Sequence, residues 1–255
     1  MRRIDLILVT YALSQELLEL FTAADAPNVF WRVFTHSAHE DVLMAVRAIE
    51  ARAKLRMCVY DYQTNRGLAR SWNDGIYYAY MTGADLAVLI NDDMLPGRED
   101  VQRVARAAML YPHVGIVKCM GFDERSQTRT SMEFGLTGIT RAGWEQVGAF
   151  DEMIWPIYWE DIDWERRRKL LGVEEYMVVD THARHAGSKT AIVTPNGVAQ
   201  AQVHYDVNAR YYRDKWGGTH LEGERFTHPF NNPALGCYIS PARRHNPYPS
   251  EARKP

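Results

Sequence analysis

Two consecutive carboxylates follow an apolar segment in the first half of the sequence. The run Leu86–Ile90 leads directly into Asn91-Asp92-Asp93. Such a continuous apolar run is typical of a buried strand. Open α/β sheets bind ligands at the edge where the carboxyl ends of such strands lie. Two carboxylates at that rim favour a divalent cation that takes oxygen ligands. The alternative is that Asp92 and Asp93 cap the turn leading to Pro96-Gly97.

A second acidic cluster, Glu160-Asp161-Ile162-Asp163, opens a helical pattern that runs to Leu171. Acidic residues in the first turn of a helix are stabilised by its dipole, so a structural role accounts for part of the cluster. Three aromatic residues precede it, namely Trp155, Tyr158 and Trp159. A helix cap needs no aromatic ring, whereas sugar faces stack on such rings. The three are therefore candidate acceptor-binding residues beside a candidate catalytic pair.

Both clusters belong to an ordered series that resembles the family 2 inverting glycosyltransferases, which share the GT-A fold. The matching residues lie between about Ile4 and Gly217 and are Asn65-x-Gly67, Asn73-x-Gly75, Asn91-Asp92-Asp93, Gly148-x-Phe150-Asp151-Glu152, Glu160-Asp161 and a histidine before Gly187-Ser188. Each piece is weak alone, but the ordered series is specific for the family. The resemblance implies transfer of a sugar from a nucleoside diphosphate donor to a hydroxyl acceptor. It does not identify the sugar or the acceptor.

The resemblance also implies roles for the acidic residues. Asp93 would bind Mn²⁺ or Mg²⁺, which stabilises negative charge on the leaving nucleoside diphosphate, and Asp92 would contact the donor ribose or metal-bound water. Asp161 would act as general base, because the acceptor hydroxyl has a pKa far above neutrality. Glu160 would hold an acceptor hydroxyl or orient the base. For Asp163 a role as a helix cap suffices.

A histidine completes the metal site or contacts the diphosphate in related enzymes. The position before Gly187-Ser188 favours His185, with His182 and His204 as the alternatives. For His182 and His185 a solvated or core histidine is nearly as common, and His204 is the weaker third choice.

By resemblance, the loops after the first three strands grip the donor. The candidate donor-binding residues are Thr10, Tyr11, Thr35, Asn65, Arg66, Gly67, Asn73, Asp92 and Asp93. Arg66 suits a phosphate contact or a surface ion pair equally well. The sequence departs from the family after the second strand, where Thr35-His36-Ser37 replaces the usual aspartate. The identity of the base is therefore not predicted.

An α/β fold must position these residues. Apolar runs alternate with helical patterns, which predicts a mostly parallel sheet with helices on both faces. The predicted strands are Ile4–Val9, Val29–Phe34, Arg56–Tyr60, Leu86–Ile90, Gly115–Cys119 and Tyr176–Asp180, with Phe134–Ile139 as an edge strand. The predicted helices include Leu68–Met81, Arg141–Val147 and Asn208–Trp216. In the last of these, Lys215 complements the helix dipole and has a structural role.

The 255 residues and the net charge of -2 fit one large domain without a general attraction to nucleic acid. We predict a GT-A domain over residues 1–218. Residues 219–255 are rich in Pro, His, Asn and Arg, so we expect an extension that wraps the domain, contacts a partner such as a second copy, or stays partly disordered.

Other features bear on cellular location. The three cysteines, which lie far apart, indicate neither a disulfide framework nor a zinc site. No segment resembles a signal peptide or reaches the ~20 apolar residues of a membrane span. A soluble, cytoplasmic protein is expected.

The leading hypothesis is an inverting, metal-dependent glycosyltransferase whose acceptor is a glycan, a protein side chain or a modified base. One alternative is a non-catalytic glycan-binding protein of the same fold. A sugar-nucleotide nucleotidylyltransferase is less favoured. It would need a glycine-rich loop with Arg and Lys after the first strand, where this chain has Thr10-Tyr11-Ala12-Leu13-Ser14.

Overall fold

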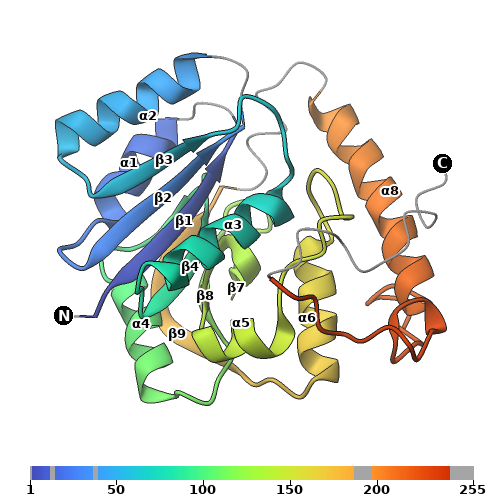
Figure 1. Cartoon of the computed structure of the whole chain (residues 1–255). Coiled ribbons are helices and arrows are strands. Elements are labelled where there is room, and N and C mark those ends of the chain that lie inside the picture. The colour runs from blue at the N-terminus through green and yellow to red at the C-terminus, as the bar shows by residue number, and fades with distance from the viewer. Residues whose placement is uncertain (1, 12–14, 37–39, 187–196, 242–255) are drawn as a thin grey trace.

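The computed structural model describes residues 2–11, 15–36, 40–186 and 197–241, and in them one nine-stranded sheet forms the centre of the molecule (Figure 1). The strands are β1 (Ile4–Thr10), β2 (Val29–Thr35), β3 (Met57–Asp61), β4 (Leu86–Asn91), β5 (Met94–Leu95), β6 (Ile116–Asp123), β7 (Thr128–Ser131), β8 (Leu136–Ile139) and β9 (Glu175–His185). The helices are α1 (Gln15–Ala24), α2 (Glu40–Ala53), α3 (Leu68–Met81), α4 (Asp100–Leu110), α5 (Arg141–Val147), α6 (Glu160–Leu170) and α8 (Gly197–Trp216), with short 3₁₀ turns η1 (Glu133–Gly135) and η2 (Pro229–Asn231).

The strand order is β3-β2-β1-β4-β8-β6-β9-β5, with β7 paired to β6. The pairs β3-β2, β2-β1, β1-β4 and β6-β9 are parallel, whereas β8 runs against both β4 and β6. The strands β1, β2, β3, β4, β6 and β9 therefore all point the same way. The predicted α/β architecture with a mostly parallel sheet is confirmed.

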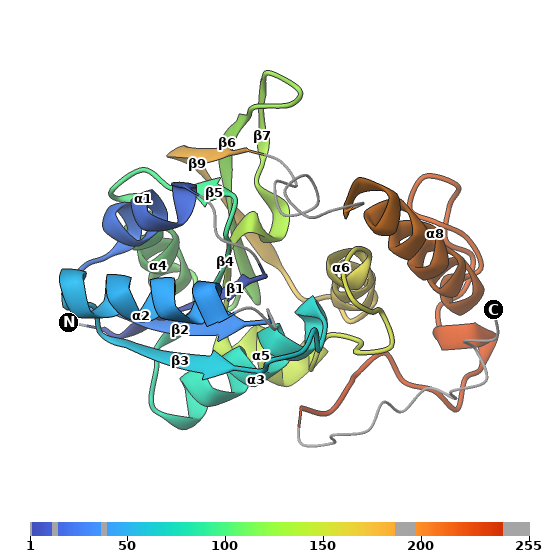
Figure 2. The ribbon, with the colours of Figure 1, turned by 90° about the horizontal axis from the view of Figure 1, so that it is seen from above.

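Helices cover both faces of the sheet, as predicted. Along β1, Ile4, Leu6 and Leu8 pack in one apolar cluster with residues of α1, α2 and α4. Ile7 points the other way into a second cluster with residues of α3, α5 and α6. This is the two-residue alternation of a strand that is buried on both sides. Figure 2 shows α1 and α4 on one side of the sheet and α3 and α5 on the other.

The prediction that Phe134–Ile139 forms an edge strand is wrong. Leu136–Ile139 lies between β4 and β6, and all four residues are buried. A local pattern does not show which strands will pair with a segment, so an interior position could not be recognised here. The helices over Leu68–Met81 and Arg141–Val147 have the predicted bounds, whereas α8 begins at Gly197, well before the predicted Asn208.

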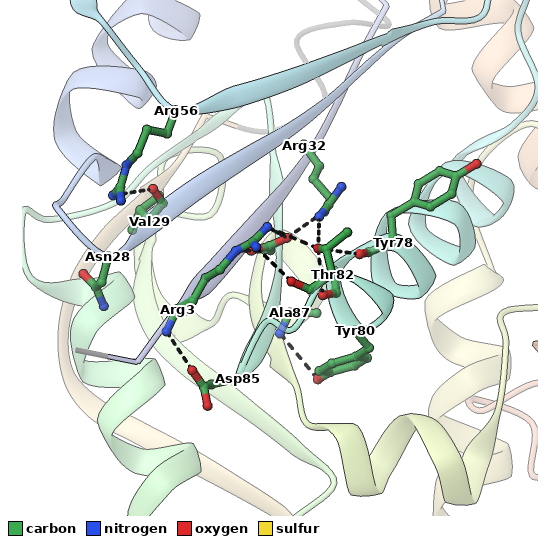
Figure 3. A network of polar contacts seen from close by, with 12 residues as sticks. Arg3, Asn28, Val29, Arg32, Arg56, Tyr78, Tyr80, Thr82, Asp85 and Ala87 are labelled. Carbon is green, nitrogen blue, oxygen red and sulfur yellow. Dashed lines mark hydrogen bonds and ion pairs between the residues drawn. The ribbon is translucent and has the colours of Figure 1, made fainter.

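A buried polar network anchors the C-terminal end of α3 to the first two strands (Figure 3). Arg32 donates to Asp5 at 2.6 Å and to the Thr82 hydroxyl at 2.6 Å, and Asp5 is fully buried. The Arg3 side chain also donates to the carbonyl of Thr82, at 3.0 Å. With this end of α3 held at the amino edge of the sheet, its N-terminal end lies at the carboxyl edge, where the candidate site is.

The segment just before α6 and helix α8 form a smaller packed unit. Its core contains Ile154, Trp159, Tyr211, Tyr212 and Trp216. After α8 the chain runs back towards α6 and the sheet (Figure 1), and there the Ala149 N–H donates to the carbonyl of Ile239 at 2.7 Å. Within residues 219–241 the chain therefore contacts the domain at Ala149, and the remainder of the predicted extension, residues 242–255, lies outside the described residues. Among the helices described, none has the length and apolar character needed to span a membrane.

Candidate functional site

The first four strands end side by side at the carboxyl edge of the sheet. Thr10 pairs in register with Thr35, and Thr35 with Asp61, while Val9 pairs with Asn91. The parallel register explains why loops that are distant in sequence begin next to one another. The turn of Asp92 and Asp93 and the predicted donor loops therefore share this edge.

Asp93 meets His185 at this edge. The pairing of β5 with β9 places Met94 opposite His185, and His185 Nε2 lies 3.2 Å from a carboxylate oxygen of Asp93. The other ring nitrogen of His185 lies 3.4 Å from Asp123. Hydrogen bonding to Asp93, with a smaller contribution from Asp123, raises the pKa of His185 although burial opposes this.

The other two candidate histidines lie elsewhere. The backbone N–H of His182 donates to the Asp100 carboxylate, at 3.0 and 3.1 Å from its two oxygens. The ring of His204 lies edge-on to Trp155, with centroids 5.7 Å apart. Of the three, His185 is the one that the structure brings to Asp93.

The Asp93–His185 pair fits an open metal site. Carboxylate and imidazole are both ligands of Mn²⁺ and related ions. In the described residues no three His, Cys, Asp or Glu side chains converge as a closed cage. A closed cage is not required, since Mg²⁺-type ions are often bound by one or two protein ligands together with substrate phosphates and water.

The loop before α3 packs directly on the segment that leads to the acidic cluster. Gly67 has φ +86°, and a Cβ there would lie 2.7 Å from the Trp155 ring, so only glycine fits. The Asn65 side chain accepts a hydrogen bond from the Gly67 N–H at 2.9 Å and fixes this turn. The predicted donor loop and the predicted acceptor segment are thereby in contact.

Two other donor-loop candidates have different surroundings. The Arg66 guanidinium lies 4.7 Å from the centre of the Tyr62 ring and makes no ion pair with any described residue. The Arg66 side chain is exposed. Asn73, in contrast, is buried, and its amide exchanges hydrogen bonds of 2.7 and 3.0 Å with the backbone of Phe150. We therefore correct the prediction for Asn73, because it faces inward from α3 and positions a loop.

The acidic cluster begins α6 after a strained turn. Tyr158 and Trp159 have φ of 76° and 80°, a region that costs free energy for residues with a side chain and recurs at functional sites. Glu160 is 3% exposed, and its Oε2 has no hydrogen-bond partner among the described residues. Burial and the charge of Asp161 raise the pKa of Glu160 well above its usual value.

Asp161 is the more accessible member of the pair. One carboxylate oxygen accepts the Ile162 N–H at 2.8 Å, which orients the side chain at the start of α6. Burial, aided by the charge of Glu133, raises the pKa of Asp161. A carboxylate that holds its proton more tightly than usual is a better general base for a hydroxyl group.

Asp163 does not cap the helix as expected. It is fully buried and lies 2.6 Å from Lys215, 2.9 Å from Arg167 and 2.8 Å from the indole nitrogen of Trp216. Burial acts in the opposite direction, but the charges of Lys215 and Arg167 lower the pKa of Asp163.

Lys215 lies in the last turn of α8 and has a structural role, as predicted, but its partners are two acidic side chains that the sequence did not indicate. Its ammonium group is buried and bridges Asp163 to Asp151, 2.8 Å away. Sequence order alone did not reveal that α8 returns to α6, so neither these partners nor the structural role of Asp151 was predicted.

The aromatic candidates for the acceptor divide into two groups. Trp155 is 40% exposed and Tyr158 is half-buried, so both can present ring surface to a ligand. Trp159 is 3% exposed and packs against Tyr205 and Tyr212, with ring centroids 5.3 and 5.1 Å away. The prediction that Trp159 contacts the acceptor is therefore corrected to a role in the core.

No protein-family model and no curated protein matches this sequence. Solved structures do match. Mannosyltransferase PcManGT from Pyrobaculum calidifontis, in complex with GDP-Man and Mn²⁺, is 19% identical with a TM-score of 0.59 over 84% of this chain and 65% of its own. TarS from S. aureus, residues 1–349 with UDP-GlcNAc, is 14% identical with a TM-score of 0.57 over 76% and 61% of the two chains. GalNAc-T7, with UDP, GalNAc and Mn²⁺, is 11% identical with a TM-score of 0.56 over 84% and 50%.

This chain thus spans 65% or less of the length of these three structures. At such low identities the similarity concerns the fold, and the architecture described above is the GT-A fold.

Proposed function

We propose that this chain is a metal-dependent, inverting glycosyltransferase that moves a sugar from a nucleoside diphosphate to a hydroxyl acceptor. The observation that carries the proposal is the meeting of Asp93 with His185 at the edge where the donor loops begin. The two residues come from distant parts of the chain and offer two metal ligands where a GT-A fold binds its donor. The family 2 assignment rests on the ordered motifs of the sequence.

In this proposal Asp93 and His185 hold Mn²⁺ or Mg²⁺, with Asp92 in the same turn. The ion, when bound, neutralises charge on the leaving diphosphate. Thr10, Tyr11, Thr35, Asn65 and Gly67 form the donor side of the site, and the exposed Arg66 reaches a phosphate oxygen. The structures with similar folds contain GDP-Man, UDP or UDP-GlcNAc, so guanine- and uracil-linked sugars are the first donors to test.

On the acceptor side, Asp161 takes the proton of the attacking hydroxyl. Glu160 has a buried oxygen without a partner among the described residues, which suits a hydrogen bond from an acceptor hydroxyl. Trp155 and Tyr158 supply ring surface beside this pair. Attack from the face opposite the diphosphate inverts the anomeric carbon.

Calorimetry tests the metal and donor parts together. We expect UDP, GDP or dTDP to bind the parent protein in Mn²⁺ or Mg²⁺ and to bind much more weakly in EDTA. Asp93→Asn should reduce the metal-dependent part, while Asp214→Asn, which changes an exposed carboxylate on α8, should not. Equal binding with and without metal would remove Asp93 and His185 from donor binding, and absence of binding by every nucleotide would contradict the proposed function.

A further inference from the structure

A carboxylate that the motif series did not include lies at the end of β3. Asp61 is in register with Thr35, and Thr35 with Thr10, so the three side chains form a row at the carboxyl edge. Asp61 Oδ1 accepts hydrogen bonds from the Thr35 hydroxyl at 3.0 Å and the Gln63 N–H at 3.2 Å. Oδ2 makes no hydrogen bond to any described residue, and Asp61 is half-buried. The side chain is therefore held in place with one oxygen available.

The neighbouring His36 cannot take the place of the missing aspartate after β2. It is 4% exposed, and its two ring nitrogens lie 3.3 Å from the Asn65 carbonyl oxygen and 2.6 Å from the Ser71 hydroxyl. Burial lowers the pKa of His36, so the ring is neutral near pH 7. Both nitrogens are used within the fold, whereas Asp61 is an acidic residue that contacts Thr35, the residue just before His36.

The distance along the sheet edge from β4 to β3 matches the length of a nucleoside diphosphate. From β4, which ends before Asp93, to β3 there are three strand spacings of about 4.8 Å, or about 14 Å in all. This is close to the reach of a nucleoside diphosphate from a metal-bound phosphate to the far edge of its base. Thr10, Thr35 and Asp61 also lie on one face, because Leu8, Val33 and Val59, each two residues earlier, all belong to the cluster under α1 and α2.

We propose that Asp61 accepts a hydrogen bond from a ring N–H of the donor base. This inference rests on the proposed function. A carboxylate only accepts hydrogen bonds, so it pairs with the ring N–H of uracil, thymine or guanine. Adenine and cytosine have no proton on the corresponding ring nitrogen, which a carboxylate facing it repels, and they offer a donor only in the exocyclic amino group beside it. Asp61 thus selects bases that carry a protonated ring nitrogen, although the family's usual aspartate is absent.

The test measures binding of UDP, GDP, CDP and ADP to the parent and to Asp61→Asn by calorimetry in Mn²⁺. Asparagine keeps an acceptor for Thr35 and Gln63 but replaces the free oxygen with a donor. A hydrogen bond to a charged group contributes about 1.5–3 kcal/mol, so affinity for UDP or GDP should fall about 10- to 100-fold. Affinity for CDP or ADP should stay the same or rise. Asp214→Asn is the matched control.

A modified ligand gives an independent measurement on the unaltered protein. N3-methyl-UDP lacks the ring N–H, as does N1-methyl-GDP, which replaces it if GDP is the better ligand. The methylated nucleotide should bind the unaltered protein as weakly as the unmethylated nucleotide binds Asp61→Asn. Methylation of the base should change the affinity of Asp61→Asn for the nucleotide only slightly.

Each result separates this inference from the proposed function. If the unaltered protein and Asp61→Asn bind a nucleotide equally well, Asp61 does not contact the base, while the proposed function stands. A parent that prefers CDP or ADP would overturn the base selection alone. If no nucleotide binds the parent, both proposals fall together.

Discussion

Glu160 and Asp161 begin the same helix but meet different surroundings. Glu160 is closed in, with a carboxylate oxygen lacking a partner among the described residues, whereas Asp161 is half-buried and oriented by the Ile162 N–H. Burial raises the pKa of both carboxyl groups. The fold thus keeps two carboxylates where water is scarce, an arrangement that costs stability and is typical of catalytic sites.

At the residue scale we predict that Asp161 acts in chemistry and not in donor binding. Asp161→Asn keeps the shape but removes the base, so turnover should fall roughly 10²–10⁴-fold while calorimetric donor affinity barely changes. The raised pKa means that the base is protonated, and activity lost, as pH falls through a value above the ~3.9 of an ordinary aspartate. A rate profile from pH 4 to 8 should show this acid limb.

The matched variant is Glu160→Gln, which should weaken acceptor use and lower turnover less than Asp161→Asn does. If Asp161→Asn turns over like the parent while Glu160→Gln is inactive, the two roles are exchanged. An acid limb below that of an ordinary aspartate would show that Asp161 is not the base.

Individual residues were harder to predict than motifs. The strand-end position of Asp92-Asp93 could be recognised because an apolar run marks a buried strand. The orientations of Asn73, Trp159 and Asp163 depend on what packs against them, and all three face inward. Asp61 could have been found by the same strand-end argument that indicated Asp93, but the motif series drew attention to other positions.

At the element scale, a buried ion cluster joins α8 to α6. Lys215, near the end of α8, pairs with Asp163 in the first turn of α6 and with Asp151 in the loop before it. All three side chains are fully buried. Because Asp163 lies two residues after Asp161, this cluster also sets where the candidate base sits.

We predict that Lys215→Met is strongly destabilising. Methionine fills a similar volume but leaves Asp151 and Asp163 with less compensating charge, and breaking a buried pair from one side costs about 3–5 kcal/mol. Urea unfolding followed by circular dichroism measures the change. Arg213→Met, on the exposed side of the same helix, is the control and should have little effect. Similar small losses in both variants would show that the buried cluster contributes little to stability.

Elements were predicted well where their pattern is local. The bounds of α3 and α5 match the prediction because apolar residues recur at helical spacing and the polar ends are clear. The position of β8 was missed because its neighbours β4 and β6 come from other parts of the chain. The early start of α8 was missed because its first half lacks a clear apolar face, as the exposed Val203 and Val207 show.

At the scale of the whole molecule, the segment after α8 contributes Ile239 to the domain core. Ile239 is 5% exposed, forms a bridge with Gly148 and packs with the cluster that contains Phe150 and Trp164. Its composition, rich in Pro, Asn and Arg and without a periodic apolar pattern, predicted an extension that wraps the domain, contacts a partner or stays partly disordered. A few buried side chains are enough to hold such a segment against the surface of a folded domain.

This packing predicts that Ile239→Ala destabilises the domain by about 2–5 kcal/mol, the usual cost of truncating a buried aliphatic side chain. Tyr238→Ala removes a larger but 44% exposed side chain from the adjacent position and should cost much less. Urea unfolding of both variants gives the comparison. Gly148 has φ +82°, and a Cβ there would lie 2.0 Å from the carbonyl oxygen of Ile239, so Gly148→Ala should be at least as damaging as Ile239→Ala. If Ile239→Ala and Tyr238→Ala are equally mild, the segment after α8 is an accessory to a domain that is stable without it.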